Sequence, residues 1–168
     1  MSLCIRAEEP GDIAAIEAVI LAAFRNAPHT GHNEHCIVDA LRRAGALSVS
    51  LVAEEHGSII GHVAFSPVAL SQGDADWYGL GPVSVEPRHQ GKGIGSRLIG
   101  RGLSALRDRA AAGCVVLGEP QYYGRFGFRV EPGLLLPGVP PGYFQAMTLC
   151  GPLPSGTVAY HGAFEALR

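Results

Sequence analysis

The sequence has no excess of positive charge and no long apolar run, and each absence excludes a class of protein. Its 13 Lys and Arg residues stand against 15 Asp and Glu residues, which gives a formal net charge of −2. Such a chain has no positive field with which to hold a phosphate backbone non-specifically, so we expect no nucleic-acid partner. No stretch approaches the ~18 apolar residues that a membrane-spanning helix needs, so we expect no membrane association.

Cysteines are few and widely spaced. The four lie at least 32 residues apart and form no CxxC pair; they are Cys4, Cys36, Cys114 and Cys150. This spacing argues against a zinc ribbon or a redox pair, and buried free thiols are the simplest interpretation. The first residues, MSLCIRAEEPGD, include charges and lack an apolar run, unlike a usual signal peptide. We therefore expect a reducing, cytoplasmic setting.

The composition is that of an ordinary globular chain. Of the 168 residues, 47% are hydrophobic and 17% are charged, which is typical of one domain, and we expect it to span residues 1–168. The 23 Gly and 12 Pro residues show no repeat period, so they indicate many tight turns. No internal repeat and no linker is visible.

The hydrophobic pattern predicts short strands that alternate with helices. Period-two and buried apolar runs predict strands at 4–7, 47–54, 58–70, 77–85, 114–117, 128–130 and 145–150. Helical periodicity predicts helices at 13–26, 34–44 and 95–112 and one helical turn at 122–126. The polar segments 27–33 and 71–76 and the proline-rich segment 132–142 are expected to be loops.

A glycine-rich segment, residues 90–96, lies between the predicted strand 77–85 and the long helix. Three glycines in five residues, Gly91, Gly93 and Gly95, let the backbone approach an anion closely, and the helix start adds unpaired N–H groups. The segment is not a P-loop, because no Lys-Ser/Thr pair closes the required spacing, and Ser96 replaces the third glycine of a dinucleotide-binding motif. A turn that serves only chain reversal is the alternative. We interpret the segment as a phosphate-binding loop and call it the glycine loop.

Two motifs in register carry a resemblance to a known family. Gln90, Gly93 and Gly95 match the pattern Q/R-x-x-G-x-G/A, and the stretch from Tyr123 to Phe128 matches Y-x-x-x-G-F. With these motifs and the order of the predicted elements, the chain resembles the GNAT superfamily of acyl-CoA-dependent N-acetyltransferases over nearly its whole length. The segments YYGRFGF and GTVAYHGAF are most similar to an uncharacterised bacterial subgroup of predicted N-acetyltransferases.

The resemblance implies a mixed α/β fold. It implies a central, mostly antiparallel sheet of six to seven strands, flanked by about four helices. The sheet would splay open between the strands 77–85 and 114–117, with acetyl-CoA as cosubstrate in the opening and no metal. The pantetheine arm would pair with backbone groups of Val83, Ser84 and Val85.

The pyrophosphate would lie on the glycine loop. The resemblance implies that it takes N–H groups from Gly91, Lys92, Gly93, Ile94, Gly95 and Ser96. The side chain of Gln90 would lie beside it, and Tyr122 and Phe126 would complete the cofactor-binding set. Many family members carry Arg at position 90, so Arg88 or Lys92 would have to supply the positive charge here.

Acetyl transfer to an amine needs an uncharged nucleophile, a polarised carbonyl and a proton for the departing thiolate. The resemblance places a general acid at Tyr123, whose phenol suits a thiol leaving group; packing of the short helix is the alternative role. Tyr122 is the adjacent alternative. A strand N–H group near residues 83–85 would hold the carbonyl.

The general base is harder to locate. Some family members carry a Glu where this chain has Gly81, so Glu119 is the candidate base, with Glu54, Glu86 and a water chain as alternatives. Each carboxylate has a plain role as a solvated charge. His62, in an apolar strand, is interpreted as a hydrogen-bonded strand histidine.

A cluster of metal-binding residue types is weaker evidence for a site. It comprises His29, His32, His35 and Cys36. Pro28 and Gly31 disfavour the continuous helix that would align these side chains, so we interpret the segment as a polar loop bordering the acceptor site and expect no metal. Residues Leu134–Leu136 either form a partner surface or cover the end of the sheet. A second copy of the chain, in a homodimer, is a candidate partner.

The sequence thus predicts an N-acetyltransferase that moves an acetyl or short acyl group from acetyl-CoA to a primary amine. The amine would belong to a small molecule or a peptide and would attack the thioester directly in a ternary complex. A non-catalytic acyl-CoA-binding sensor is the alternative, because Gly81 lacks the carboxylate. A nucleotide-binding module that uses the same loop is a third interpretation.

Overall fold

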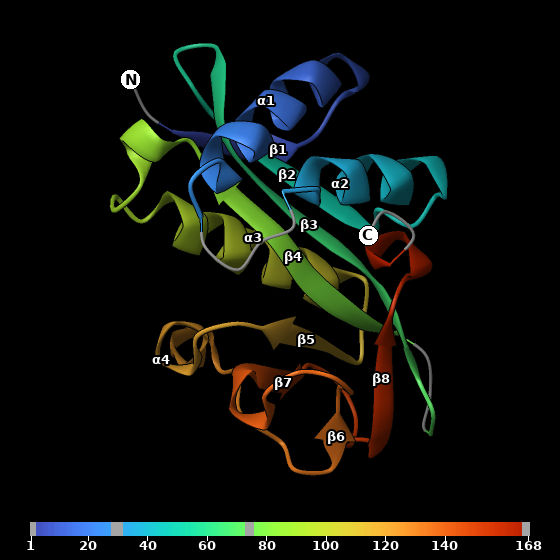
Figure 1. Cartoon of the computed structure of the whole chain (residues 1–168). Helices are drawn as coiled ribbons and strands as arrows, with labels where there is room; N and C mark the ends of the chain where they lie inside the picture. Colours follow the sequence, from blue (N-terminus) through green and yellow to red (C-terminus); the bar gives the residue numbers. More distant parts are fainter. Residues whose placement is uncertain (1–2, 28–31, 73–75, 166–168) are drawn as a thin grey trace.

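An open, eight-stranded sheet runs through the centre of the molecule (Figure 1). The computed structural model describes residues 3–27, 32–72 and 76–165. The strands are β1 (Cys4–Ala7), β2 (Val49–Glu55), β3 (Ser58–Leu70), β4 (Trp77–Val85), β5 (Gly113–Leu117), β6 (Leu134–Leu135), β7 (Phe144–Thr148) and β8 (Gly156–Tyr160). The main order is β1-β2-β3-β4-β5-β7, while β8 pairs with both β3 and β6. The pairs β4–β5 and β6–β8 are parallel and the others antiparallel, so the sheet is mixed and mostly antiparallel, as expected.

Helices cover both faces of the sheet. Helices α1 (Ile13–Phe24) and α2 (Glu34–Arg43) lie on one face, α3 (Ile94–Asp108) lies on the other, and α4 (Pro120–Tyr123) follows β5 (Figure 1). Single 3₁₀ turns are η1 (Pro10–Asp12), η2 (Pro87–His89), η3 (Gly124–Phe126), η4 (Pro141–Tyr143) and η5 (Gly162–Phe164). The four helices agree with the number expected.

The buried apolar residues divide according to these two faces. On the α1–α2 face, Ile16, Ile20 and Val38 pack against Val52 and Ala64 of the sheet. On the opposite face, α3 lies close to β3: a Cβ on its Gly102 would come within 2.1 Å of the Phe65 ring. The missing side chain therefore lets α3 pack directly on the sheet.

The long helix is shorter than expected. It ends at Asp108 instead of residue 112, because Ala110 adopts a left-handed conformation with φ of 58°. The N–H of Ala110 bonds to the carbonyl of Arg107, and the N–H of Ala111 bonds to that of Leu106. These are the two hydrogen bonds of a Schellman motif, which usually has glycine at this position. Without a glycine, the sequence does not reveal this end.

The C-terminal part of the sheet also differs from the expectation. The predicted strand 128–130 is a single bridge, in which Arg129 exchanges two backbone hydrogen bonds with Ala146. Two strands, β6 and β8, were not predicted, so the sheet has eight strands instead of six to seven. Strand β8 has one buried residue, Val158, and forms by long-range pairing with the end of β3, which no local pattern reveals.

Two further expectations are settled by burial. All four cysteines are free thiols, but Cys4 and Cys150 are exposed and Cys36 is half-buried, so the expectation of buried thiols holds for Cys114 alone. Leu134 is buried in the cluster around Val158, whereas Leu135 is exposed.

Among the described helices, none is long and apolar enough to cross a membrane.

Candidate active site

Strands β4 and β5 separate soon after they meet. They pair at three positions only, Trp77 with Gly113, Tyr78 with Cys114 and Gly79 with Val115. Beyond Gly79, β4 runs on to Val85 and pairs on this side with no strand of the described residues, while β5 pairs with β7 on its other edge. We call this divergence the fork and Gly79 its vertex. The sheet therefore splays where the sequence predicted an opening (Figure 1).

A bulge in β4 lies just beyond the vertex. Val63 of β3 pairs with Val83 and Phe65 pairs with Leu80, so Gly81 and Pro82 together face one residue of β3. Gly81 has a φ of 139°, which side chains rarely tolerate. Bulges bend a strand and re-aim its backbone, often beside functional sites. The position at which a carboxylate was sought is thus a backbone bend without a side chain.

Along β4, the backbone N–H and C=O groups of successive residues point alternately toward β3 and toward the fork. The N–H of Glu86 donates to the carbonyl of Ile60 on β3 at 2.8 Å. Because antiparallel pairing alternates, the polar backbone groups of Ser84 also face β3, whereas those of Val83 and Val85 face the fork. The expected backbone role of Ser84 is therefore corrected: its N–H and C=O belong to β3.

The glycine loop follows β4 directly. The Gln90 side chain donates from Nε2 to the Val85 carbonyl at 2.9 Å, which ties the loop to the fork. Gly91 and Gly93 have φ angles of 78° and 82°, so both use a conformation that favours glycine. Lys92 is exposed. The loop folds as it does because glycines stand at the two left-handed positions.

The start of α3 presents unpaired donors. Its first backbone hydrogen bond runs from the N–H of Arg97 to the carbonyl of Gly93, at 3.1 Å. The N–H groups of Ile94, Gly95 and Ser96 consequently have no partner within the helix, and the positive end of the helix dipole lies among them. The Ile94 side chain is buried and anchors this end. This arrangement suits a phosphate group.

Tyr122 connects α4 to the glycine loop. Its hydroxyl lies 3.0 Å from the Ser96 Oγ, and the Arg125 guanidinium lies 4.5 Å from its ring centroid. The Phe126 ring meets the same tyrosine edge-on, at 5.6 Å between centroids. A Cβ on Gly95 would lie 3.6 Å from the Tyr122 hydroxyl. Tyr122 therefore borders the start of α3, and Phe126 packs against it.

Tyr123 points to a different place from Tyr122. Its ring packs on Gly118, where a Cβ would come within 2.4 Å, and lies edge-on to Phe128 at 6.0 Å. Burial raises the pKa of Tyr123 to about 12, and the neighbouring Tyr122 adds to the effect. The Tyr123 hydroxyl is therefore protonated at neutral pH and can donate a hydrogen bond.

The three candidate carboxylates differ in their surroundings. Glu119 is exposed, and its carbonyl accepts the N–H groups of Tyr122 and Tyr123, so it begins α4. Glu54 pairs with Arg6 at 3.3 Å. Glu86 pairs with Arg88 at 2.8 Å, which leaves Arg88 less available as a phosphate ligand. The two alternatives to Glu119 thus already have cationic partners.

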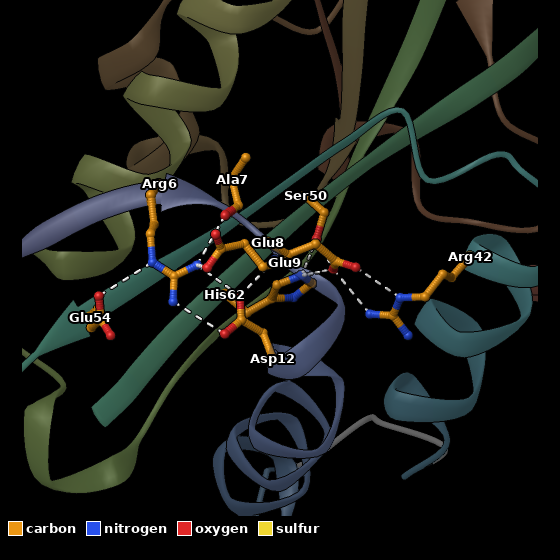
Figure 2. A network of polar contacts seen from close by, with 9 residues as sticks. All are labelled: Arg6, Ala7, Glu8, Glu9, Asp12, Arg42, Ser50, Glu54 and His62. Carbon is orange, nitrogen blue, oxygen red and sulfur yellow. Dashed lines mark hydrogen bonds and ion pairs between the residues drawn. The ribbon is translucent and has the colours of Figure 1, made fainter. Parts of the chain in front are cut away.

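A network of polar contacts crosses the α1–α2 face of the sheet (Figure 2). Arg42 donates two hydrogen bonds to Glu8, at 2.9 and 3.0 Å, and Ser50 donates to the same carboxylate. Ser50 Oγ lies 2.8 Å from the Nε2 of His62. Burial raises the pKa of Glu8, but the hydrogen bonds from Arg42 and Ser50 outweigh it and leave the pKa lowered.

Only one of the two ring nitrogens of His62, the histidine in this network, has a hydrogen-bond partner among the described residues. His62 is fully buried and its Nδ1 has no hydrogen-bond partner among the described residues, so the expectation of a hydrogen-bonded strand histidine holds for one nitrogen. Burial lowers the pKa of His62 from 6.5 to about 4, more than the nearby Glu8 raises it, and Arg42 lowers it further. His62 is therefore neutral in the folded chain at neutral pH.

This neutrality makes stability depend on pH. In the unfolded chain, His62 takes up a proton as the pH falls below about 6.5. In the folded chain, it stays neutral until the pH reaches about 4. Acidification across this window should therefore lower the free energy of unfolding by up to about 3 kcal/mol. Urea unfolding at a series of pH values measures the slope. His62→Gln should flatten it, and the exposed His56→Gln should not; an unchanged slope in His62→Gln contradicts the assignment.

The histidine-rich segment is only partly described. His29 lies outside the described residues. Of the others, His35 Nε2 lies 3.3 Å from Cys36 Sγ. Within residues 3–27, 32–72 and 76–165, no group of three or more His, Cys, Asp or Glu side chains is arranged to hold a metal ion.

Sequence reasoning missed one residue at the fork. The ring of Tyr160, from β8, lies over Gly79 at the vertex: a Cβ there would come within 2.9 Å of the Tyr160 Cε2. Its only signal was its place in the segment GTVAYHGAF, which carried part of the resemblance. Because β8 itself was not predicted, nothing placed this tyrosine near β4.

Comparisons with known proteins agree with this geometry. The model of the acetyltransferase (GNAT) family matches residues 13–128. The uncharacterized N-acetyltransferase YhbS of Escherichia coli K12 is 36% identical over 129 residues, which cover 76% of this chain and 74% of that protein. A crystal structure of YhbS from Escherichia coli in complex with CoA is 34% identical, with a TM-score of 0.86, and the match covers 99% of this chain and 93% of that one.

A second solved structure is more similar in sequence. It is a GNAT family acetyltransferase from Brucella melitensis in complex with acetyl-CoA, at 49% identity and a TM-score of 0.87. The match covers 97% of this chain and 98% of that one. Family model, relatives and fold agree, and the chain belongs to the GNAT family of acetyltransferases.

Proposed function

We propose that this chain transfers an acetyl or short acyl group from acetyl-CoA to a primary amine, by direct attack in a ternary complex. One observation carries the proposal. The fork leaves the backbone groups of Val83 and Val85 facing an edge that has no strand partner among the described residues. That edge leads directly into the glycine loop, whose Gln90 bonds to the Val85 carbonyl. A ligand that carries amide groups at one end and phosphates at the other would match both the strand edge and the glycine loop.

The proposed cosubstrate fits along β4. The amides of the pantetheine arm pair with Val83 and Val85 as an added strand would, and the pyrophosphate takes the N–H groups at the start of α3. Val85 and the vertex at Gly79 pair with Gly61 and Ser66 of β3, and a strand rises about 3.3 Å per residue, so the two lie about 17 Å apart. The thioester consequently falls in the inner part of the fork. The related structures that hold acetyl-CoA and CoA support this assignment.

The proposed reaction uses few groups. The amine nitrogen attacks the thioester carbon, a C–N bond forms, the C–S bond breaks and the thiolate takes up a proton. Tyr123 is the proposed proton donor, since its hydroxyl is protonated at neutral pH. Glu119 is the proposed base, because its carboxylate is exposed and has no ion pair among the described residues. The acceptor is a small molecule or a peptide that carries the amine.

A non-catalytic acyl-CoA sensor is the second candidate function. It is favoured by Gly81, which puts a bend where a carboxylate base could stand. Such a sensor would bind acetyl-CoA as an enzyme does and would differ only in turnover.

The two functions are separated by measuring thiol release from acetyl-CoA over a panel of small amines, polyamines and lysine peptides. We expect at least one amine to accelerate release and to gain the mass of an acetyl group. Acetyl-CoA binding in calorimetry with no release above the rate without protein, for every class of amine, would favour the sensor. Absence of binding would contradict both.

A further inference from the structure

Four buried polar atoms that have no hydrogen-bond partner among the described residues lie on one face of the sheet, on β3, β4 and β8. Residues 62, 64 and 66 alternate along β3, and Ala64 packs against α1, so His62 and Ser66 face the α1–α2 side. Their partners on β4 are Ser84 and Gly79, and the latter lies under Tyr160. Among the described residues, the atoms that lack a hydrogen bond there are His62 Nδ1, Ser66 Oγ, Ser84 Oγ and the Tyr160 hydroxyl. Buried polar atoms are rarely left unpaired, so each of these calls for an explanation.

Tyr160 is the member of this group that lies at the vertex. A Cβ on Gly79 would come within 2.9 Å of its Cε2 and 3.3 Å of its Cζ, so the hydroxyl-bearing end of the ring covers the last paired position of β4 and β5. The Phe164 ring, edge-on at 5.2 Å, holds the tyrosine from behind. The absence of a side chain at Gly79 is what admits the ring.

Tyr160 and Tyr123 approach the fork from opposite faces. Tyr123 packs with the cluster that α3 covers, whereas Tyr160 packs with the cluster around Trp77 and Val158. Burial raises the pKa of Tyr160, and the proximity of Cys114 and Tyr123 raises it further. The hydroxyl of Tyr160 consequently keeps its proton, which suits a hydrogen-bond donor and does not suit a base.

We propose that the Tyr160 hydroxyl donates a hydrogen bond to the carbonyl oxygen of the bound thioester and holds the negative charge that develops there during transfer. The inference rests on the proposed function for the position of the thioester. Tyr160 neither gains nor loses a proton in the step: the amine displaces the thiolate, and the oxygen's charge rises and then falls again. A buried donor aimed at a developing oxyanion lowers the barrier for the attack.

The first test compares binding, which requires no acceptor. CoA has no carbonyl at the thiol, so a donor to that oxygen should make wild type bind acetyl-CoA about threefold to tenfold more tightly than CoA. In Tyr160→Phe this preference should fall severalfold, since only a backbone N–H group would still hold the carbonyl, while the affinity for CoA stays unchanged. Tyr78→Phe removes a hydroxyl from a buried tyrosine that lies on β4 and packs in the cluster that α3 covers, and it should keep the preference. An unchanged ratio in Tyr160→Phe would overturn the proposal.

The second test is kinetic, with an amine found active in the panel. Tyr160→Phe should lower kcat at least about tenfold with little change in KM for acetyl-CoA. Gly79→Ala, whose Cβ displaces the Tyr160 ring, should produce the same loss. Wild-type kcat in Tyr160→Phe would overturn the role. If wild type shows no turnover with any amine, the transferase proposal fails while the binding ratio still decides whether Tyr160 contacts the carbonyl.

Discussion

Replacing Tyr123 with phenylalanine should lower the turnover number by about 10²-fold or more and leave the affinity for acetyl-CoA almost unchanged. The substitution deletes one hydroxyl and keeps the ring that packs on Gly118 and Phe128. Without a donor, the thiolate would have to leave as an anion. Pre-steady-state measurements that show chemistry to be rate-limiting are needed for the comparison.

Tyr122→Phe is the matched control for this prediction. It also deletes one tyrosine hydroxyl from α4, but that hydroxyl contacts Ser96 at the glycine loop. We expect it to weaken CoA binding modestly and to change turnover by less than Tyr123→Phe does. Wild-type turnover in Tyr123→Phe would reduce Tyr123 to a packing residue. A larger loss in Tyr122→Phe would assign the acid to Tyr122 instead.

Gly95→Val should abolish the thermal stabilisation that CoA gives and raise the Kd for CoA by about 10²-fold or more. Each tenfold change in Kd corresponds to about 1.4 kcal/mol of binding free energy. In the free chain a Cβ at this position makes ordinary contacts, with the Tyr122 hydroxyl at 3.6 Å and Val85 at 3.8 Å. Its φ is not left-handed, so the backbone is not strained. The added methyl groups fill the space beside the unpaired N–H groups that would meet the pyrophosphate.

Gly100→Val is the matched control in the same helix. Gly100 is exposed, and a Cβ there would meet nothing within 4 Å. This variant should fold, and CoA should stabilise it as it does wild type. Comparing the two in thermal-shift titrations separates the loss of the phosphate site from a general effect on α3. Undiminished stabilisation of Gly95→Val by CoA would remove the pyrophosphate from the glycine loop.

The parts of the site that are local in sequence could be predicted. The glycine loop needs left-handed residues at fixed positions, and the sequence has Gly91 and Gly93 there. Strand β4 was predicted with its bounds because a mostly apolar stretch runs from Trp77 to Val85 and the pair Glu86-Pro87 follows it. Motif spacing then located Tyr122 and Tyr123 on one short helix, as the structure has them.

The parts that depend on distant segments could not be predicted from local patterns. Which backbone groups of β4 face the fork depends on the pairing register with β3, and that register shifts at Gly81. The place of Tyr160 depends on β8 crossing to the end of β3, 90 or so residues away in sequence. The end of α3 lacks the glycine that usually marks such a motif.

The central claim is that acyl-CoA lies in the fork along β4, and amide hydrogen exchange measured by NMR with and without acetyl-CoA tests it most directly. Saturating acetyl-CoA should slow exchange of the N–H groups of Val83, Val85, Gly95 and Ser96, which face the fork or the start of α3. The N–H of Ser84, bonded to β3 in both states, should change little. Unchanged exchange at Val83 and Val85, with acetyl-CoA shown to be bound, would contradict the account.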